Sequence, residues 1–597
     1  MDKVWQHRVL SVTTVYSVCR SFDSLLEKAF GPNGKSTLLR SATGQVLITS
    51  VGCTVLRCID VGHSLGNMIV ESVAAHHNYA GDGGKTFLLY LTSIFNSIAS
   101  SAEERLALPD SEQRHSLVCA MHCIRSQLFP HVLLPAVQRN CFQVEICKDE
   151  KTTRTVMHNL VKTHLCGKYT ESIQNHLSHL LVDFLCYRLI SFGSLSTEVA
   201  VCIDNFDLLC IDTDCALPLS SYICDRIVIQ RDFLSFSHSP TEHCLVKFIL
   251  LSSFKGCEVD SVFEAHSLSS LDKALSWNTR CNVTLTGWVQ KNSVNLILST
   301  GSFDSVLHAL CSKAGISLVQ YVDKEDFERL QMLFHISAIE HMSDLCEIKS
   351  EEFIGYSEVC EAKTFGQKRF VCLKLPEGNH ANMQTTSSGT ACDCVEVSEA
   401  AGKRYTHPCL QRQLVICGMS AGACQQIRLD LLHALKILRL WLDRTWMNAE
   451  DASPFTAAYI AGGGSFELIC YDAIQHYLQQ NALRRDLRAS CEAVRAAMLA
   501  VPLRLLLNSF QPKLATVLHV TEGVKSPQAS VISAVGFDGR SGKKLQVNTT
   551  VVEPLAGKVL LLSHVLELTE QLLRVDSVLH VKKKLKLVER SQSEEIE

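Results

Sequence analysis

Two glycine-rich stretches near the start of the chain constrain its fold more than any other feature. The first reads AFGPNGKSTLL from Ala29 to Leu39, and the second reads AGDGGKTFLL from Ala80 to Leu89. Each contains Gly-Lys-Ser or Gly-Lys-Thr, the ending of a P-loop, whose backbone amides wrap a nucleotide phosphate. The fold therefore depends on whether either stretch is a P-loop.

The spacing of the glycines excludes a P-loop at both places. The motif needs a first glycine at positions 29 and 79, and these positions hold Ala29 and Tyr79. A P-loop also follows a buried strand, whereas apolar residues at helical spacing precede both stretches, over residues 9–30 and 64–77. The sequence therefore predicts helices that stop at glycine turns.

The residues between and after the two stretches complete this pattern. Val46–Thr49 is rich in strand-forming residues, and we expect it to turn at residues 50–52 and pair with Thr54–Leu56 as a hairpin. A further apolar helix is predicted from Lys85 towards Ile98. The predicted order is helix, Gly-Pro turn, hairpin, helix, glycine turn, helix.

The middle of the chain has a different character from its ends. Strands are predicted at 226–233, 245–251 and 414–419, and a strand–helix–strand unit followed by another helix at 294–334. Residues 376–408 are polar and rich in Gly, Ser and Thr, which indicates a loop or insertion. Residues 586–597 form a charged tail. An α/β block thus lies inside a chain whose two ends are helical.

Composition narrows the class of protein. The chain has 597 residues, 47% of them hydrophobic and 20% charged, and a net charge of −4. This is a globular composition without the basic excess that nucleic acids or acidic membranes attract. No apolar run reaches the roughly 18 residues of a membrane span, and the first residues lack a signal-peptide pattern. We therefore expect no nucleic-acid partner and no membrane insertion.

The 27 cysteines are expected to be buried free thiols in a reducing compartment. They lie within apolar stretches such as LVCAMHC and FELICYD. Structural zinc sites usually draw on cysteines spaced Cys-x-x-Cys. That spacing is absent, and the CDC at Cys392–Cys394 stands alone.

The order and spacing of the motifs resemble the group II chaperonins. That family carries Gly-Pro-x-Gly, a Thr-Asn-Asp-Gly hairpin turn and Gly-Asp-Gly-Thr-Thr, where this chain has GPNG, TSVG and GDGGKT. GGGSFE at Gly462–Glu467 is similar to the family's Gly-Gly-Gly-Ala-x-Glu, and KAGISLVQYVDKEDFERL, LVICGMSAGACQQIRLDLLHALKIL and SAVGFDGRSGKKLQVNTTVVEPLAGK extend the resemblance over almost the whole chain. Within the family, TGQVLIT, MIVESV, LLHALKIL and the ending DSVLHVKK most resemble the chaperonin-like Bardet–Biedl syndrome proteins.

The resemblance implies a group II chaperonin-like fold, a helical equatorial domain with nested α/β intermediate and apical domains. The expected boundaries are 1–128 and 441–585 for the equatorial domain, 129–212 and 409–440 for the intermediate domain, 213–408 for the apical domain, and 586–597 for the tail.

The resemblance also implies an ATP site in the equatorial domain. Backbone amides and helix ends of the two glycine loops would hold the phosphates, and Asp82 would hold Mg²⁺, a cation that prefers oxygen ligands. The implied nucleotide-binding residues are Gly31, Pro32, Gly34, Gly81, Asp82, Gly83, Gly84, Lys85, Thr86, Gly463 and Glu553. Gly84 and Lys85 replace two family threonines. Lys85 either reaches a phosphate as a point charge or is a solvated lysine at a helix start.

Two departures bear on hydrolysis. Val51 replaces the aspartate of the hairpin turn, and His433 replaces the aspartate expected before Ala-Leu in the returning helix. In the family these carboxylates help hold the metal and orient the attacking water, and phosphoryl transfer depends on such positioning. Asp430 is one helical turn away, out of register. We expect ATP binding with weak or absent hydrolysis, and no catalytic residue at either position.

The resemblance implies a chaperonin-like assembly factor that helps assemble the BBSome, a ciliary coat complex, and so supports cilium formation. Expected partners are the other chaperonin-like Bardet–Biedl syndrome proteins, subunits of the cytosolic chaperonin and BBSome subunits as clients. The expected places are the cytoplasm, centrosome and ciliary basal body. Two alternatives stay open: an active ATP-hydrolysing subunit of a chaperonin ring, and a P-loop kinase, which the glycine spacing opposes.

Overall fold

The computed structural model describes residues 8–9, 11–40, 44, 46–103, 110–146, 148–187, 195–237, 245–252, 268–341, 345, 352–376, 408–446, 456–509, 536–541 and 550–578. Contacts divide the chain into two compact units. Unit 1 combines residues 1–174 with 436–597, and unit 2 comprises residues 175–435. Each unit is described by itself below. The finer division into equatorial, intermediate and apical domains stays a prediction.

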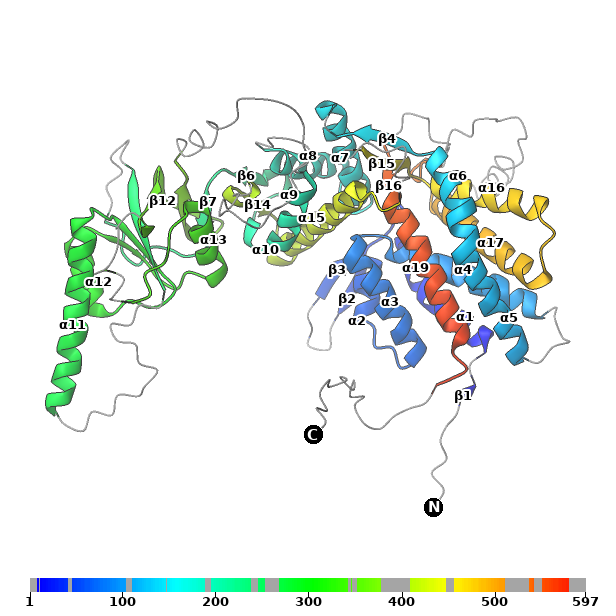
Figure 1. Ribbon diagram of the computed structural model, residues 1–597, viewed down its shortest axis with the longest axis horizontal. Coiled ribbons are helices and arrows are strands. Elements are labelled where there is room, and N and C mark those ends of the chain that lie inside the picture. Colours follow the sequence, from blue (N-terminus) through cyan, green and yellow to red (C-terminus); the bar gives the residue numbers. More distant parts are fainter. Residues whose placement is uncertain are drawn as a thin grey trace, which may run out of the picture. The chain divides into compact units, whose positions relative to one another are not determined.

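Unit 1 is built on helices from both ends of the chain (Figure 1). Its principal helices are α1 (Val12–Leu26), α3 (Ser64–Ala80), α4 (Gly84–Glu103), α5 (Asp110–Cys123), α16 (Ser465–Gln480), α17 (Arg485–Leu507) and α19 (Leu555–Arg574). Helix α4 contacts α1, α3, α17 and α19. Its side chains Phe87, Leu88, Leu91, Ile94 and Phe95 are almost fully buried in one continuous core. The N-terminal and C-terminal segments therefore fold as one body.

Helix α1 shows why these sequences are helical. Ser11 caps its first turn, with Oγ accepting a hydrogen bond from the Thr14 N–H at 3.1 Å. Its buried residues Val15, Cys19 and Phe22 recur every three or four positions and line one face. The helix ends before Gly31, whose φ of 83° is a left-handed conformation that glycine adopts readily.

Smaller elements complete unit 1. The remaining helices are α2 (Gly52–Cys58), the π-helical η2 (Ile124–Leu133), α6 (Leu134–Arg139) and α7 (Glu150–Leu165), while α8 (Glu171–Leu185) begins in unit 1 and continues into unit 2. The strands form an antiparallel sheet of β16 (Val552–Pro554), β15 (Thr456–Ala461) and β4 (Phe142–Glu145), and two antiparallel pairs, β1 (Arg8–Val9) with β17 (Ser577–Val578) and β2 (Thr37–Arg40) with β3 (Val46–Thr49). The β1–β17 pair joins segments from the two ends of the chain.

The predicted hairpin exists with a different partner. Val46–Thr49 is a strand, but it pairs with the preceding β2, so that Thr37 lies opposite Thr49. The residues expected to pair back, Thr54–Leu56, belong to helix α2. Cys53, Val55 and Leu56 are buried on one side of that helix. Burial of a short helical face thus outweighs the strand preference of its residues.

Unit 2 contains three small sheets with helices packed on them. One sheet has the order β10 (Ser317–Val319), β9 (Leu296–Ser299), β8 (Val246–Leu251), β11 (Gly355–Ser357), with β10, β9 and β8 parallel. The others are β12 (Val359–Phe365), β13 (Lys368–Lys374) and β7 (Ile227–Ile229), and β5 (Cys210–Thr213), β14 (Gln413–Cys417) and β6 (Tyr222–Cys224). The helices are α9 (Leu195–Asp204), α10 (Phe206–Leu209), α11 (Leu268–Lys291), α12 (Ser305–Lys313), α13 (Lys324–Phe334) and α15 (Ala421–Leu442), whose last residues belong to unit 1. The predicted strand–helix–strand unit is confirmed as β9, α12 and β10.

One helical run in unit 1 has the length and apolar composition of a membrane span, although the sequence predicts no such segment. Residues Arg114–Arg139 are long and apolar enough, by length and composition, to cross a membrane. No uninterrupted apolar stretch indicated this, because polar residues break the run. Met121, Ile124, Leu128 and Leu133 from this run are buried in the core of unit 1, which accounts for its apolar composition.

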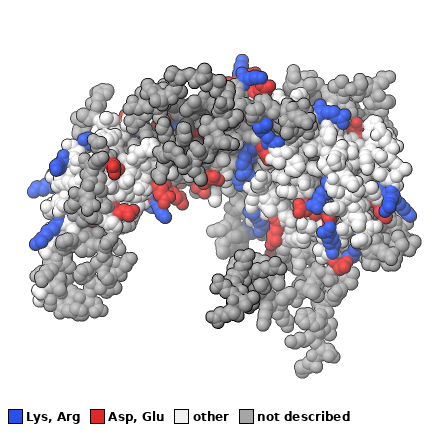
Figure 2. Space-filling model, viewed as in Figure 1, with Lys and Arg blue, Asp and Glu red and all other residues white. Residues whose placement is uncertain are grey.

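Charge and cysteine placement follow the composition. On the face seen in Figure 2, Lys and Arg side chains alternate with Asp and Glu side chains over the described surface. Every cysteine that the structure describes is a free thiol, and most of these thiols are buried. The predicted loop, apart from its end residues 376 and 408, and the predicted tail lie outside the described residues.

Candidate functional site

The Gly-Pro loop at 31–34 is held by side chains from the C-terminal part of the chain. Asn33 donates from Nδ2 to the carbonyl oxygens of Asn508 and Gly539, each at 3.2 Å. Asn508 in turn donates from Nδ2 to the carbonyl oxygen of Phe30 at 2.9 Å. A Cβ at position 34 would lie 2.6 Å from the Ala29 carbonyl oxygen, so this close turn requires glycine at Gly34. The loop is thus tied to the C-terminal segment, and within it the Gly34 N–H donates to the Gly31 carbonyl oxygen at 3.0 Å.

The second glycine loop, at 81–84, joins helix α3 to helix α4. Gly81 ends α3 with a φ of 80°, and its N–H donates to the carbonyl oxygen of His77 at 2.8 Å. Gly83 also has a positive φ, 89°, and Gly84 begins α4. Two left-handed glycines thus turn the chain between two buried helices. The loop brings the N-terminus of α4, which favours negative charge, next to Asp82.

Asp82 is the centre of a polar chain. Its Oδ1 accepts from the Gly83 N–H at 2.7 Å, and its Oδ2 lies 3.4 Å from Nδ1 of His164 on α7. Nε2 of His164 lies 2.9 Å from Nζ of Lys168. Burial acts to raise the pKa of Asp82, but the hydrogen bond with His164 and the charges of His164 and Lys168 hold that pKa well below its usual range. The carboxylate is therefore ionised and begins a line of contacts that ends at Lys168.

Lys85 ties the two glycine loops together. Its Nζ donates to the carbonyl oxygen of Ala29 at 2.6 Å, immediately before the Gly-Pro loop. Its stem packs under Gly52, where a Cβ would lie 2.6 Å from Lys85 Cγ. Burial lowers the pKa of Lys85 to about 8, an effect that the charge of Asp82 opposes. The solvated-lysine alternative is therefore wrong, and the reach of Lys85 to a phosphate stays a prediction.

A third loop, which carries no recognisable motif in the sequence, covers the Gly-Pro turn. A Cβ at Gly167 would lie 2.9 Å from the Gly31 carbonyl oxygen, and a Cβ at Gly539 would lie 2.6 Å from Pro32 Cδ. The turn at Gly31–Pro32 is thus packed between two further glycines of the chain. This packing leaves no room for a side chain at either position.

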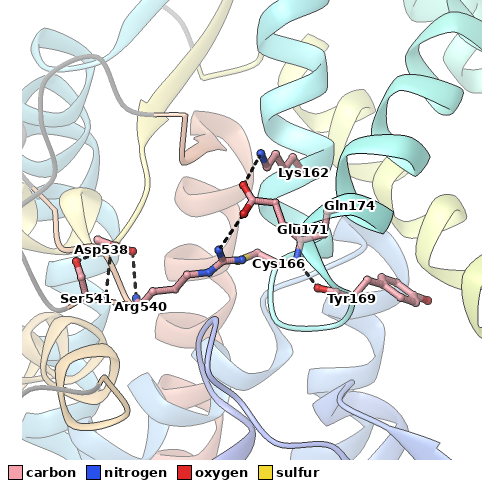
Figure 3. A network of polar contacts seen from close by, with 8 residues as sticks. All are labelled: Lys162, Cys166, Tyr169, Glu171, Gln174, Asp538, Arg540 and Ser541. Atoms are coloured by element: carbon pink, nitrogen blue, oxygen red, sulfur yellow. Dashed lines mark hydrogen bonds and ion pairs between the residues drawn. The ribbon is translucent and has the colours of Figure 1, made fainter. Parts of the chain in front are cut away.

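Figure 3 shows the polar network that holds these covering segments in place. Glu171 lies between two cations, 3.5 Å from Nζ of Lys162 and 3.9 Å from Nη1 of Arg540. Asp538 accepts from the Arg540 N–H at 3.0 Å and from the Ser541 hydroxyl at 2.6 Å. Segment 536–541 is thereby fixed beside the end of α7.

The triple glycine and Glu553 belong to a neighbouring part of unit 1. Gly463 has a φ of 66°, and its carbonyl oxygen accepts from the Phe537 N–H at 2.8 Å, which links this turn to segment 536–541. Glu553 lies on β16, with Oε2 3.0 Å from Nζ of Lys558. The same Nζ lies 3.1 Å from Oε1 of Glu467, which also accepts from the Tyr90 hydroxyl at 2.6 Å.

This second charged cluster was missed at the level of sequence. Glu467 is fully buried and Lys558 nearly so, and both lie in stretches already quoted for their resemblance, GGGSFE and EPLAGK. The signal was a charged residue within an apolar motif. Such a residue is almost never fully buried unless it is paired.

The position expected to supply a hydrolytic carboxylate in unit 1 is apolar. Val51 precedes α2, is 7% exposed, and packs with Cys53 and Ala74. His433 and Asp430 lie on α15 within unit 2, where Asp430 is buried and accepts from Gln426 at 3.0 Å. Val51 offers neither a metal ligand nor a group that orients water.

The fit of a magnesium ion can be tested on the donor set at Asp82. Mg²⁺ takes near-octahedral oxygen coordination, in which one or two protein carboxylates are joined by water molecules and the phosphates of a substrate. Among the predicted site residues in the two glycine loops, Asp82 is the one carboxylate, and both of its oxygens face donors. The second family carboxylate is replaced by Val51. Each Asp82 carboxylate oxygen keeps a further lone pair and the Asp82 side chain is 60% exposed, so Asp82 could hold Mg²⁺ together with water molecules and phosphate oxygens.

The structure thus brings several predicted residues together. The two glycine loops meet through Lys85 and Ala29, and segment 536–541 joins the Gly-Pro loop to the triple glycine. Thr86 lies in the first turn of α4, half-buried. The N-terminus of α4, with Lys85 in its first turn, is the part of this arrangement that favours a phosphate-bearing ligand.

A comparison with known protein families identifies the fold. The model of the TCP-1/cpn60 chaperonin family matches residues 22–583. The chain therefore belongs to the TCP-1/cpn60 chaperonin family and has its fold.

Individual relatives fall into two groups. The BBSome complex assembly protein BBS10 of Mus musculus is 24% identical over 386 residues, 61% of this chain and 53% of that protein, and the protein of the same name from Homo sapiens is 21% identical over 451 residues, 72% and 57%. Thermosome subunit alpha of Archaeoglobus fulgidus is 20% identical over 561 residues, 93% of this chain and 89% of that subunit. The chain thus spans little more than half the length of the BBS10 relatives it matches.

Proposed function

We propose that this chain is a chaperonin-like assembly factor of the BBSome, similar to the Bardet–Biedl syndrome 10 protein in particular, that binds ATP and hydrolyses it weakly or not at all. The observation that carries the proposal is a chaperonin chain whose relatives include proteins named for BBSome complex assembly. In keeping with this, its partners would be other chaperonin-like Bardet–Biedl syndrome proteins, cytosolic chaperonin subunits and BBSome subunits. It would act in the cytoplasm and at the centrosome and basal body, in cilium formation.

ATP binding is supported by the geometry of the two glycine loops. Gly81 and Gly83 turn the chain tightly into α4, and the N-terminus of α4 favours an anion. Lys85 and Asn33 fix these loops against each other and against the C-terminal segment. The binding surface is thereby formed before a ligand arrives, which reduces the entropy lost on binding.

Weak hydrolysis is supported by the side chain at Val51. Phosphoryl transfer requires an oriented water and stabilisation of charge that develops in the transition state. Val51 supplies neither, and its place in an apolar cluster with Cys53 and Ala74 gives water no polar partner there. Asp82 remains, but its carboxylate accepts hydrogen bonds within the chain.

The experiment is nucleotide binding together with turnover on the purified full chain. We expect saturable binding of ATP with turnover near the background rate, and Asp82→Ala should leave that turnover unchanged. An archaeal thermosome measured in parallel serves as the positive control for the turnover assay. Turnover at the thermosome rate that Asp82→Ala abolishes would refute the proposal.

The same preparation tests the alternative of an active ring subunit. Retention of Gly-Asp-Gly and a match that covers 89% of a thermosome subunit favour that alternative. A closed double ring of this 66.2 kDa chain would sediment far beyond a small complex. Ring formation together with ATP turnover would favour the alternative, and turnover near background would oppose it.

A further inference from the structure

Helix α5, which packs beside α19 (Figure 1), carries two histidines and an exposed cysteine on one face. His115, Cys119 and His122 are four and three residues apart, which places them within about 60° of arc around the helix. All three line a cavity of about 670 Å³ that Leu573 and Arg574 at the end of α19 also line. Cys119 thus differs from the buried thiols that the composition predicts.

Two of these three side chains lie at the separation of zinc ligands. Nε2 of His115 is 3.7 Å from Sγ of Cys119. Zn²⁺ binds sulfur at about 2.3 Å and nitrogen at about 2.0–2.1 Å with tetrahedral angles, so two such ligand atoms lie about 3.5 Å apart. A single ion can therefore contact both atoms after a small rotation of either side chain.

The third side chain contacts a buried carboxylate. Nδ1 of His122 lies 3.5 Å from Oε1 of Glu570, whose side chain is 4% exposed. A histidine that binds a metal through one ring nitrogen usually contacts a carboxylate, a carbonyl group or water through the other. Because His122 also lines the cavity and its side chain is 56% exposed, a side-chain rotation is enough to bring its Nε2 to the ion.

The two arginines of this cavity each have a carboxylate partner. Nη1 of Arg114 lies 3.2 Å from Oδ1 of Asp576, and Arg574 forms an ion pair with Glu570. The carboxylates offset the positive charge that would otherwise repel a cation. A set of one thiolate and two imidazoles favours Zn²⁺ over Mg²⁺ and Ca²⁺, which prefer oxygen ligands.

We propose that His115, Cys119 and His122 bind one Zn²⁺ ion, with a water molecule in the fourth position. The Cys119 thiol loses its proton to solvent as the bond between Sγ and zinc forms. The site shares no residue with the two glycine loops, so the proposal does not depend on nucleotide binding.

Alkylation of Cys119 tests the site in the full chain. Reduced, metal-free protein is treated with iodoacetamide, with and without one equivalent of Zn²⁺, and mass spectrometry follows the peptide that carries Cys119. We expect Zn²⁺ to slow this alkylation at least about tenfold, because a sulfur bonded to zinc is no longer the free thiolate that reacts. Cys58, an exposed thiol of α2, is the internal control and should react at the same rate in both conditions. Equal alkylation of Cys119 with and without Zn²⁺ would overturn the proposal.

Variants assign the other two ligands. His115→Gln and His122→Gln should each raise the Zn²⁺ concentration that protects Cys119 by about tenfold or more. His131→Gln, at an exposed position of η2, is the matched control and should keep the protection of the unaltered chain. All three histidines are exposed, so we expect the variants to unfold at the normal temperature. Unchanged protection in either His115→Gln or His122→Gln would overturn the three-ligand site.

Discussion

At the residue scale, Lys85 shows how one side chain can change role with its surroundings. Its sequence context, directly after a glycine loop, is compatible with either phosphate contact or solvent exposure. In the structure its stem fills the space that Gly52 leaves, and its ammonium group reaches Ala29. The residue is therefore a cross-link between two loops that are about fifty positions apart in sequence.

Replacing Lys85 by methionine tests this cross-link. Lys85→Met keeps the apolar stem but removes the donor to Ala29, and we expect the free energy of unfolding to fall by about 1.5–3 kcal/mol, the usual contribution of a hydrogen bond to a charged group. Urea unfolding of the full chain measures it. Lys35→Met, at an exposed lysine of the first stretch, is the control and should change stability by less than about 0.5 kcal/mol. Equal losses in the two variants would contradict the cross-link.

At the element scale, the packing of α3 against α19 buries a pair of histidines. Nδ1 of His76 lies 3.0 Å from Nδ1 of His564, so one ring donates and the other accepts. Burial, followed by the nearby His564 and His77, lowers the pKa of His76 to about 3. Burial likewise lowers the pKa of His77 to about 4. The rings of His76 and His77 are therefore neutral in the folded protein at ordinary pH.

The lowered pKa values of His76 and His77 predict how stability depends on pH. When the pH falls below 6.5, the unfolded chain takes up protons on these histidines but the folded chain does not until about pH 3–4. Stability must therefore fall with decreasing pH across that window, by about 1.4 kcal/mol per pH unit for each histidine. Urea unfolding at several pH values between about 7 and 5, the range in which an unperturbed histidine titrates, measures the direction of this change in stability.

Two variants test whether the buried histidines cause this dependence of stability on pH. His76→Leu removes one of the two titrating histidines. The leucine side chain can still pack on Phe87, whose ring centroid lies 5.7 Å from that of His76. The free energy of unfolding of this variant should fall less steeply with decreasing pH, by about 1.4 kcal/mol per pH unit, because one titrating histidine is missing. His476→Leu, at an exposed position of α16, should keep the original slope. If the stability of His76→Leu depends on pH as steeply as that of the unaltered chain, His76 is not a source of the dependence.

Sequence reasoning worked for elements whose signal is local. The helix before the Gly-Pro turn, the helix over 64–77 and the strand–helix–strand unit were predicted because their periodicity or turn residues lie within each segment. The partner of Val46–Thr49 was assigned wrongly because pairing is decided by what buries Cys53 and Val55, which lies elsewhere in the chain.

The same limit applies to the candidate site. The two glycine loops could be found from their motifs, since a left-handed turn demands glycine locally. His164, Lys168 and Gly167 could not, because their relation to Asp82 and Gly31 arises only when α7 packs against loops some eighty to a hundred and thirty positions earlier. Neither local propensity nor spacing carries that information.

At the scale of the whole of unit 1, a buried charge network connects the two ends of the chain. Tyr90 on α4 donates to Glu467 on α16, and Lys558 on α19 lies between Glu467 and Glu553. Two carboxylates share one ammonium group, and of these three side chains Glu467 is fully buried and Glu553 is 27% exposed. Removal of that ammonium leaves both without a counter-charge.

Lys558→Met should therefore be severely destabilising, by about 3–5 kcal/mol in the free energy of unfolding. Thermal and urea unfolding of the full chain measure the change. Arg488→Met removes an exposed cation that pairs with Glu492 at 3.4 Å and should cost about 0.5 kcal/mol or less. A loss for Lys558→Met no larger than that of this control would show that the network adds nothing to the union of the two segments.

The composition of unit 1 from the two ends of the chain also sets the timing of its folding. Phe95 and Leu562 share one core, yet several hundred residues separate them, which corresponds to roughly 20–90 s of synthesis at about 5–20 residues per second. During that interval the ribosome has already released the first helices, whose apolar faces have no native surface to cover them. The apolar faces of these helices thus stay uncovered until the C-terminal segment is made, and such exposed surface favours aggregation of the nascent chain.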